Sequence, residues 1–149
     1  MTVALSALDL AARLEKEFPG AILESDDDSL LVNNEKLSDI ASFLKNTPGL
    51  DFDYLTNLTA VDYKKYFELI YHLVSISCNH SLTLKTRCYD REKPTVPSLV
   101  ALWRAADLQE REVFDLFGIV FYNHPNLKRI FLWEGFPGYP LRKDFCNDT

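Results

Sequence analysis

Residues 103–145 read WRAADLQEREVFDLFGIVFYNHPNLKRIFLWEGFPGYPLRKDF, and this stretch decides how the rest of the chain is interpreted. It joins an amphipathic helical pattern, a glycine that ends it, an aromatic strand, a His-Pro turn and a basic tail. Charged residues lie inside its apolar pattern instead of beside it, and such departures from simple patterning are typical of functional positions. We therefore treat the residues before it as the scaffold that carries it.

The first part of this stretch predicts an amphipathic helix that begins near Ser98 and ends at Gly118. Its apolar positions recur at the three-to-four spacing of an α-helix, and they are Leu99, Leu102, Trp103, Ala106, Val113, Phe114 and Phe117. Glu110 lies on the same apolar stripe. Gly118 directly follows the last apolar position, where a residue in the left-handed conformation commonly ends a helix.

The other faces of this predicted helix carry charge. One face alternates in sign at helical spacing, so neighbouring charges can pair; its members are Arg104, Asp107, Arg111 and Asp115. Glu112 lies on a third face. A helix that is apolar on most of its circumference is enclosed, and enclosed carboxylates need partners. The available arginines are Arg104, Arg111, Arg129 and Arg142.

The second part predicts a short strand over Ile119–Tyr122, a turn at His124-Pro125 and an apolar run, IFLW, within residues 127–133. The tail FPGYPLRKDF combines three aromatic residues with two prolines, and extended chain of this kind forms few ladder hydrogen bonds. Such a tail either drapes over another protein or packs back on its own sheet, and the residues leave both possibilities open.

The residues before Trp103 predict a two-layer α/β domain of the α+β kind. Helical spacing covers residues 5–18 and 35–46, and apolar runs at 21–23 and 30–32 predict a strand hairpin. Residues 50–62 predict an extended segment with a bend or a short helical turn. Tyr66–Ile76 and Leu82–Tyr89 predict an antiparallel hairpin, and residues 93–98 a proline-punctuated linker.

The expected order is therefore helix, strand, strand, helix, three strands, two helices and an extended C-terminal tail. The helices pack on a mixed, largely antiparallel sheet of four to five strands. We place the domain at residues 1–132 and a docking tail at residues 133–149.

Composition and charge argue against nucleic-acid binding and against a membrane-spanning protein. The chain has 149 residues, 47% of them hydrophobic and 26% charged, which is typical of one globular domain. Residues 1–60 hold 11 acidic and 4 basic residues, and residues 61–149 hold 11 and 12, so the two parts carry −7 and +1. The acidic first part argues against nucleic-acid binding. Because no apolar run approaches roughly 18 residues and no signal pattern opens the chain, we expect a cytoplasmic protein without a membrane span.

Cysteine and histidine residues give little support for a metal or redox site. Cys78, Cys88 and Cys146 contain no C-x-x-C, so an iron–sulfur site is not expected, although Cys78 and Cys88 flank the predicted hairpin and could approach each other. We expect His72 to be a hydrogen-bonded core residue and His80 an exposed turn residue. Glu112, Asp115 and His124 could form a metal site, but no histidine follows the carboxylates at helical spacing. No phosphate-cradling glycine loop is present either.

The residues from Glu110 onward resemble the family signature of the thirty-kilodalton subunit of respiratory complex I, also called the C subunit of NADH–quinone oxidoreductase. The matching positions are Glu110-Arg111-Glu112, Asp115-Leu116-Phe117-Gly118-Ile119, Phe121, His124-Pro125, Leu127, Arg129-Ile130, Trp133-Glu134-Gly135 and Pro140-Leu141-Arg142-Lys143-Asp144-Phe145. Signature or interface roles are expected at Glu110, Arg111, Glu112, Asp115, Gly118, His124, Pro125, Arg129, Trp133, Arg142, Lys143 and Asp144. The resemblance covers roughly the last third of the chain strongly.

The resemblance implies a subunit without a redox centre or an active site of its own. FMN, iron–sulfur clusters and quinone would be held at the level of the whole complex. The chain would dock on the large subunit of the forty-nine-kilodalton, D-like type and on neighbouring iron–sulfur subunits of the peripheral arm, near the quinone site. It would be a peripheral protein on the cytoplasmic face of the cell membrane.

Two alternatives stay open. The chain could be the equivalent subunit of a related membrane-bound hydrogenase, formate hydrogenlyase or F420H2 dehydrogenase, because those assemblies resemble complex I in this module. In a different class, it could be a free-standing metal-dependent enzyme that uses Glu112, Asp115 and His124.

Overall fold

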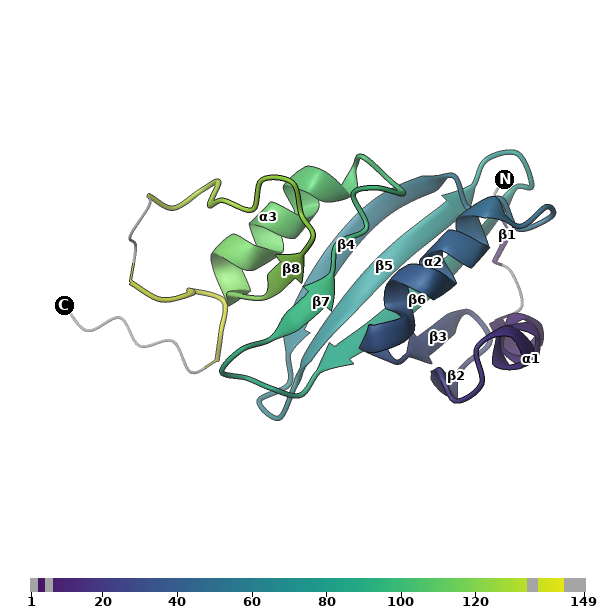
Figure 1. Cartoon of the computed structure of the whole chain (residues 1–149), viewed down its shortest axis with the longest axis horizontal. Helices are drawn as coiled ribbons and strands as arrows, with labels where there is room; N and C mark the ends of the chain where they lie inside the picture. Colours follow the sequence, from purple (N-terminus) through teal and green to yellow (C-terminus); the bar gives the residue numbers. More distant parts are fainter. Residues whose placement is uncertain (1–2, 5–6, 134–136, 144–149) are drawn as a thin grey trace.

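A mixed sheet of six strands forms the centre of the computed structural model, which describes residues 3–4, 7–133 and 137–143 (Figure 1). The strands are β1 (Val3–Ala4), β2 (Ile22–Ser25), β3 (Ser29–Val32), β4 (Tyr54–Asp62), β5 (Phe67–Ser75) and β6 (His80–Cys88). They are ordered β2-β3-β6-β5-β4, with β1 also paired to β6. A second sheet pairs β7 (Thr95–Pro97) with β8 (Val120–Tyr122) in parallel.

The long central hairpin confirms the clearest strand prediction. β5 and β6 are antiparallel, with a register that runs from Phe67 opposite Cys88 to Ser75 opposite His80. β4 is antiparallel to β5, and its register shifts between Leu55 and Asn57, within the segment for which the sequence predicted a bend or a short helical turn. β1 and β3 run parallel to β6, which makes the sheet mixed. The predicted α+β class with a mixed, largely antiparallel sheet is therefore confirmed.

Three α-helices and a short 3₁₀ helix accompany the sheet in the described part of the chain. They are α1 (Ala7–Glu17), η1 (Asn34–Lys36), α2 (Leu37–Asn46) and α3 (Ala106–Phe117). α2 and α3 lie on the same face of the sheet (Figure 1). Among the described residues, none of the helices has the length and the apolar content that a membrane crossing needs.

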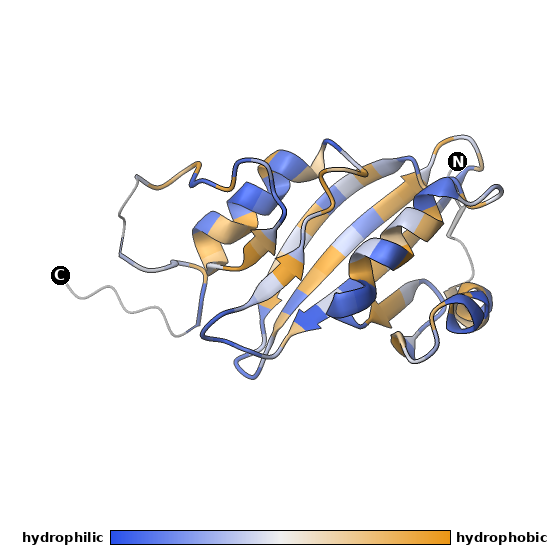
Figure 2. Cartoon of the chain, in the orientation of Figure 1, coloured by the Kyte–Doolittle hydropathy of each residue, from blue (hydrophilic) through white to orange (hydrophobic). Residues whose placement is uncertain are grey.

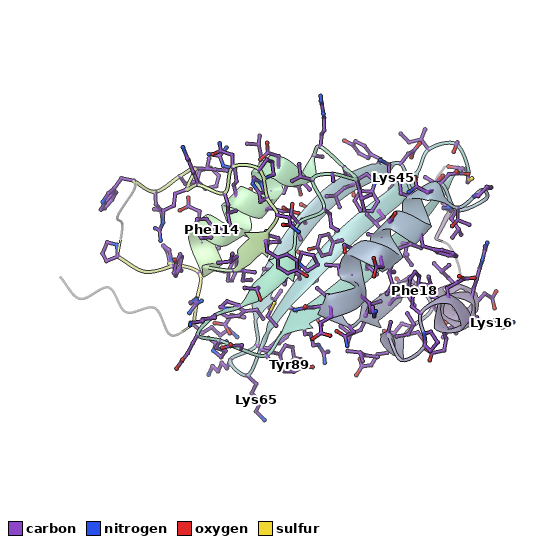
Figure 3. All side chains as sticks on the ribbon, viewed as in Figure 1. Lys16, Phe18, Lys45, Lys65, Tyr89 and Phe114 are labelled. Carbon is purple, nitrogen blue, oxygen red and sulfur yellow. The ribbon has the colours of Figure 1, made fainter. Side chains whose placement is uncertain are left out.

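Helical periodicity accounts for the packing of α2 on the sheet. Leu37, Ile40 and Leu44 recur on one side of α2 and are fully buried, while its outward side is largely hydrophilic (Figure 2). Each such burial stabilises the fold by about 1.5–3 kcal/mol. Phe18, labelled in Figure 3, follows α1 and contacts the ring of Phe43 on α2 edge-on, with centroids 5.9 Å apart. The core therefore continues from the sheet into the space between these two helices.

The structure corrects the prediction for residues 93–105. The predicted linker contains β7, and α3 begins at Ala106 instead of near Ser98, so one helix stands where two were expected. The apolar spacing before Ala106 comes from turns: the Leu99 carbonyl oxygen accepts hydrogen bonds from the amides of Leu102 and Trp103. Trp103 is buried, and its indole N–H donates to the Phe52 carbonyl oxygen at 2.9 Å. Apolar residues in a buried turn thus mimicked a helical repeat.

Two histidine predictions were wrong, and the structure excludes the possibility, left open by the sequence, that Cys78 and Cys88 approach each other. His72 is exposed, whereas His80 is half-buried, its Nε2 lying 2.7 Å from the Leu50 carbonyl oxygen and its ring against Phe52. Cys78 lies in the turn that joins β5 to β6, and Cys88 ends β6 at the far end of that hairpin. A strand of this length spans about 30 Å, so the two thiols cannot approach each other.

Candidate interaction surface

One charged face of α3 holds the irregular segment that follows β8, which we call loop 124–133. Asp107, Arg111 and Asp115 are spaced by four residues, so they lie on one side of the helix. We call these three residues the α3 ladder. Loop 124–133 passes along α3 from the level of Asp107 to the level of Asp115, and each ladder residue contacts a different part of it. In Figure 1 the loop runs along the outer side of α3, away from the sheet.

Asp115 makes the most extensive of these contacts. Its side chain is fully buried, and Oδ2 accepts hydrogen bonds from the backbone amides of Ile130, Phe131 and Leu132 at 3.1, 2.7 and 3.1 Å. The guanidinium Nε of Arg129 lies 3.6 Å from its other oxygen. Converging amides of this kind form an anion-binding concavity, and hydrogen bonds to a carboxylate are the stronger kind. The loop backbone is therefore fixed where it has no strand or helix partner.

Arg111 holds the preceding part of the loop through its carbonyl groups. Its Nε donates to the Lys128 carbonyl oxygen at 3.1 Å, and its Nη2 donates to that of Arg129 at 3.5 Å. Within the described residues Arg111 makes no ion pair, so the predicted pairing of neighbouring charges along α3 is wrong. The two charges instead contact main-chain groups of the loop: Arg111 donates to carbonyl oxygens, and Asp115 accepts from amides.

His124 fastens the start of the loop to the first turn of α3. Its Nδ1 accepts a hydrogen bond from the Asn126 amide at 2.9 Å, so the ring proton of the neutral imidazole lies on Nε2. That nitrogen lies 3.0 Å from Asp107 Oδ1 and 3.2 Å from the Asp107 carbonyl oxygen. The side chain of His124 is fully buried, which leaves no open coordination position on this residue.

Glu110 lies on the opposite, buried face of α3, as its place on the apolar stripe predicted. Its carboxylate accepts hydrogen bonds from the Ser98 hydroxyl at 2.6 Å and from the Leu99 amide at 2.8 Å. Burial raises the pKa of Glu110 to about 7. Neither partner is an arginine, so Glu110 serves to fix the turn between β7 and α3.

The C-terminal end of α3 is closed by the returning tail. Gly118 adopts the left-handed conformation, with φ of +77°, and a Cβ there would meet the Tyr139 ring at 2.7 Å. The free carbonyl oxygens of the last helical turn accept from this tail: Leu116 from the Leu141 amide at 3.0 Å, and Phe117 from Arg142 Nε at 2.5 Å. Phe114, labelled in Figure 3, lies on the same helix end with its ring centroid 6.3 Å from that of Tyr139.

Asp62, at the end of β4, anchors the tail to the sheet. It is buried and accepts two hydrogen bonds from Arg91, at 2.6 and 2.9 Å, and one from the Lys143 amide at 2.8 Å. The hydrogen bonds from Arg91 hold the pKa of Asp62 well below its usual value. No sequence pattern marked this residue, because its tail partner lies 81 positions further along the chain.

The described tail residues thus pack back on their own domain, which was one of the two possibilities left open. Residues 138–143 contact Asp62, the end of α3 and Arg129, whose Nη2 donates to the Gly138 carbonyl oxygen at 2.9 Å. Glu134, Asp144 and Cys146 lie outside the described residues.

Asp62→Asn is expected to loosen the tail and to lower the free energy of unfolding by about 2 kcal/mol, because a charge-assisted pair with Arg91 becomes a neutral one. Trypsin cleavage after Arg142, followed by mass spectrometry, should speed up. Since the folded pKa is depressed, the contribution of Asp62 is present above the ordinary pKa of 3.8 and is lost as pH falls further. Asp39→Asn, at an exposed position of α2, is the control; equal cleavage rates in both variants would contradict the anchoring role.

Large apolar side chains point outward from the elements that these polar contacts hold. Exposed fractions are 38% for Ile130, 63% for Phe131, 66% for Trp133, 61% for Leu108 and 52% for Leu141. In Figure 2 the apolar part of loop 124–133 lies at the outer end of the molecule. Soluble proteins rarely expose large contiguous apolar patches unless they bind something. The polar signature residues therefore build a scaffold, and the apolar residues beside them form the candidate interaction surface.

The structure does not bring the candidate metal ligands together. Glu112 is exposed, Asp115 is occupied by three amides, and His124 faces Asp107. Across residues 3–4, 7–133 and 137–143, no group of three or more His, Cys, Asp or Glu side chains is arranged to hold a metal ion.

Comparison with known proteins identifies related sequences and folds. The family model described as "Respiratory-chain NADH dehydrogenase, 30 Kd subunit" matches residues 30–149. The chain is 44% identical to the C subunit of the NADH-quinone oxidoreductase of Roseiflexus castenholzii, over 95% of this chain and 85% of that protein. It is 46% identical to the protein of the same name from Moorella thermoacetica, over 81% of each.

Two solved structures share the fold. One is the trypsin-resistant fragment (1–134) of Nqo5, with a TM-score of 0.64 and 27% identity, covering 80% of this chain and 98% of that one. The other is a chain of the membrane-bound sulfane sulfur reductase, an archaeal respiratory membrane complex. Its TM-score is 0.74 and its identity 26%, covering 93% of this chain and 85% of that one.

Proposed function

The chain belongs to the thirty-kilodalton subunit family of respiratory-chain NADH dehydrogenase, and from this premise we propose that it is a structural, non-catalytic subunit of the peripheral arm of complex I. The observation that supports the proposal is that the signature residues described bind main-chain groups of this same chain. Asp115 and Arg111 hold main-chain groups of loop 124–133, and Glu110 holds a turn. These side chains are occupied in positioning backbone, and the surface they support is apolar.

In this proposal the chain docks on the large subunit of the forty-nine-kilodalton, D-like type near the quinone site, beside the iron–sulfur subunits of the arm. FMN, the iron–sulfur clusters and quinone are bound by those other subunits. The assembly is peripheral on the cytoplasmic face of the membrane, and the docking role of residues 133–149 is part of the same proposal. Supporting it are the relatives that carry the name of the C subunit and the exposed aromatic residues of loop 124–133.

A second candidate is the equivalent subunit of a related membrane-bound complex, such as a hydrogenase, formate hydrogenlyase or F420H2 dehydrogenase. The observation in its favour is the similarity to a chain of the membrane-bound sulfane sulfur reductase over 93% of this chain. A shared fold at 26% identity supports the same kind of subunit in a different assembly.

Purification of the tagged native chain from its own cells in mild detergent tests both candidates. If the chain is a subunit of complex I, the D-like large subunit should co-purify with it, together with an FMN-containing, NADH-oxidising subunit. Mass spectrometry and flavin absorption detect these partners. Co-purification of a nickel-containing large subunit without the flavin subunit would favour the second candidate. A chain that purifies alone with stoichiometric metal would overturn both and revive the metal-enzyme alternative.

A further inference from the structure

The tail segment that packs back on the domain is attached without burying any of its residues. We call residues 137–143 the strap; in Figure 1 it returns to the C-terminal end of α3. Each of its side chains is exposed or half-buried, and Leu141 is 52% exposed. A segment with few buried apolar contacts opens locally at a small cost in free energy. The strap is therefore a part of the fold that can detach while the sheet stays folded.

A series of side-chain contacts begins at Asp62, where the strap is anchored to the sheet. Asp62 holds the guanidinium group of Arg91, which lies over the ring of Phe67 at 4.5 Å from the ring centroid. The guanidinium group of Arg142 lies over the same ring at 5.0 Å. Both distances are within the range of cation–π attraction. The buried ring of Phe67 thus joins the anchor to a side chain of the strap.

The series continues through the strap to Asp115. The guanidinium group of Arg142 lies 5.3 Å from the centroid of the Tyr139 ring, and that of Arg129 lies over the same ring at 4.8 Å. The Nε of Arg129 is 3.6 Å from Asp115, which holds the amides of loop 124–133. One continuous series of contacts therefore joins the anchor of the strap to the carboxylate that fixes the loop.

The charges along this series depend on the strap being closed. Three guanidinium groups face two buried carboxylates, and the middle one, that of Arg142, donates to the Phe117 carbonyl oxygen. The C-terminal end of a helix carries partial negative charge and favours a cation there. Arg129 also donates to the Gly138 carbonyl oxygen at 2.9 Å. Opening of the strap would remove the carbonyl group and the Tyr139 ring that hold Arg129 beside Asp115, and a buried carboxylate without its cation is costly.

We propose that the strap and loop 124–133 form one conformational unit, a clasp that opens and closes as a whole while the sheet remains folded. The series of contacts from Asp62 to Asp115 couples its two segments. Coupling between two sites is reciprocal, so a change at either carboxylate should loosen both segments. This inference concerns the chain by itself and does not depend on the proposed function. It adds a conformational device: any event that draws the strap away also releases the exposed loop.

Amide hydrogen exchange of the full-length chain, followed residue by residue by NMR, tests the coupling. In Asp62→Asn, the amides of Leu141 and Lys143 in the strap should exchange faster, because the anchor is weakened. The amides of residues 130–132 should exchange about tenfold faster as well, although their own acceptor, Asp115, is unchanged.

The reciprocal variant and a control complete this comparison. In Asp115→Ala, the amides of Leu141 and Lys143 should exchange about tenfold faster, although their acceptors at Leu116 and Asp62 are unchanged. Ile40→Val removes one buried methyl group from α2 and lies outside the series of contacts. It should leave exchange in the strap and in the loop within about twofold of the wild type.

Substitution of Tyr139 tests whether the series of contacts carries the coupling. Tyr139→Leu removes the ring that Arg129 and Arg142 both contact but keeps an apolar side chain. In this background Asp62→Asn should no longer speed exchange at residues 130–132. Tyr139→Phe keeps the ring and should preserve the tenfold effect.

Three results would overturn the inference. If Asp62→Asn speeds exchange in the strap but leaves residues 130–132 within about twofold, the strap and the loop open independently. If exchange rises equally in β5 and β6, the whole domain opens and no separate clasp exists. If the effect of Asp62→Asn persists in full in the Tyr139→Leu background, the contacts described do not carry the coupling. Should Asp62→Asn fail to fold, the exchange of the strap amides in Asp115→Ala decides between coupled and independent opening.

Discussion

Glu110→Ala is expected to lower the free energy of unfolding by about 3–5 kcal/mol, a larger stability loss than for any other substitution proposed. The change removes the acceptor of the Leu99 amide and the Ser98 hydroxyl, and it leaves a cavity at a position with no solvent exposure. Because these two residues begin the turn between β7 and α3, the helix should lose its fixed start. Urea denaturation followed by far-UV circular dichroism measures the loss.

Glu110→Gln separates the hydrogen bonds from the charge. The amide can accept from Leu99 with its oxygen and donate to the Ser98 hydroxyl, so this variant should remain within about 1 kcal/mol of the wild type at pH 7. The folded pKa of about 7 stands above the ordinary 4.5, so the folded state binds the proton more tightly. Stability from this group is therefore fully present below pH 4.5 and is lost as pH rises through 7, on the order of 3 kcal/mol in all. The glutamine variant should lack this slope between pH 5 and 8; an unchanged slope would contradict the assignment.

Local patterns predicted most of the scaffold because the physics there is local. Alternation and apolar runs located the β5–β6 hairpin, and helical spacing located α2. Gly118 was identified as a helix end because only a residue that tolerates positive φ suits that position. Glu110 was correctly expected to be buried, since it stands among apolar neighbours at helical spacing.

The predictions that failed depended on which groups meet across the fold. His72 lies among apolar residues of β5, but it shares its side of the strand with Ile70 and Val74, which are only half-buried, while Tyr71 and Leu73 fill the core side. Which side of a strand is buried depends on the strand's register and on which face of the sheet the helices cover. The sequence of one strand alone determines neither.

Most partners of the α3 ladder were also hidden from the sequence, although Arg129, one of the arginines expected to be available to the enclosed carboxylates, does lie beside Asp115. Asp115 and Arg111 bind amide and carbonyl groups, which every residue carries, so no residue type marks their partners. Charges at four-residue spacing then resembled an intrahelical ion network. Asp62 was missed for the same reason, because one of its partners is the main chain of Lys143. A carboxylate at an apolar position of a helix therefore indicates either hydrogen bonds to main-chain amides or a buried ion pair.

Asp115→Ala is expected to release loop 124–133 while leaving the sheet folded. Three amides lose their common acceptor, and Arg129 loses the carboxylate beside it, so unfolding should become easier by about 2–4 kcal/mol. Hydrogen–deuterium exchange should rise sharply at the amides of residues 130–132 and remain low in β5 and β6. Glu112→Ala, which removes an exposed carboxylate of the same helix, is the matched control and should leave that protection unchanged.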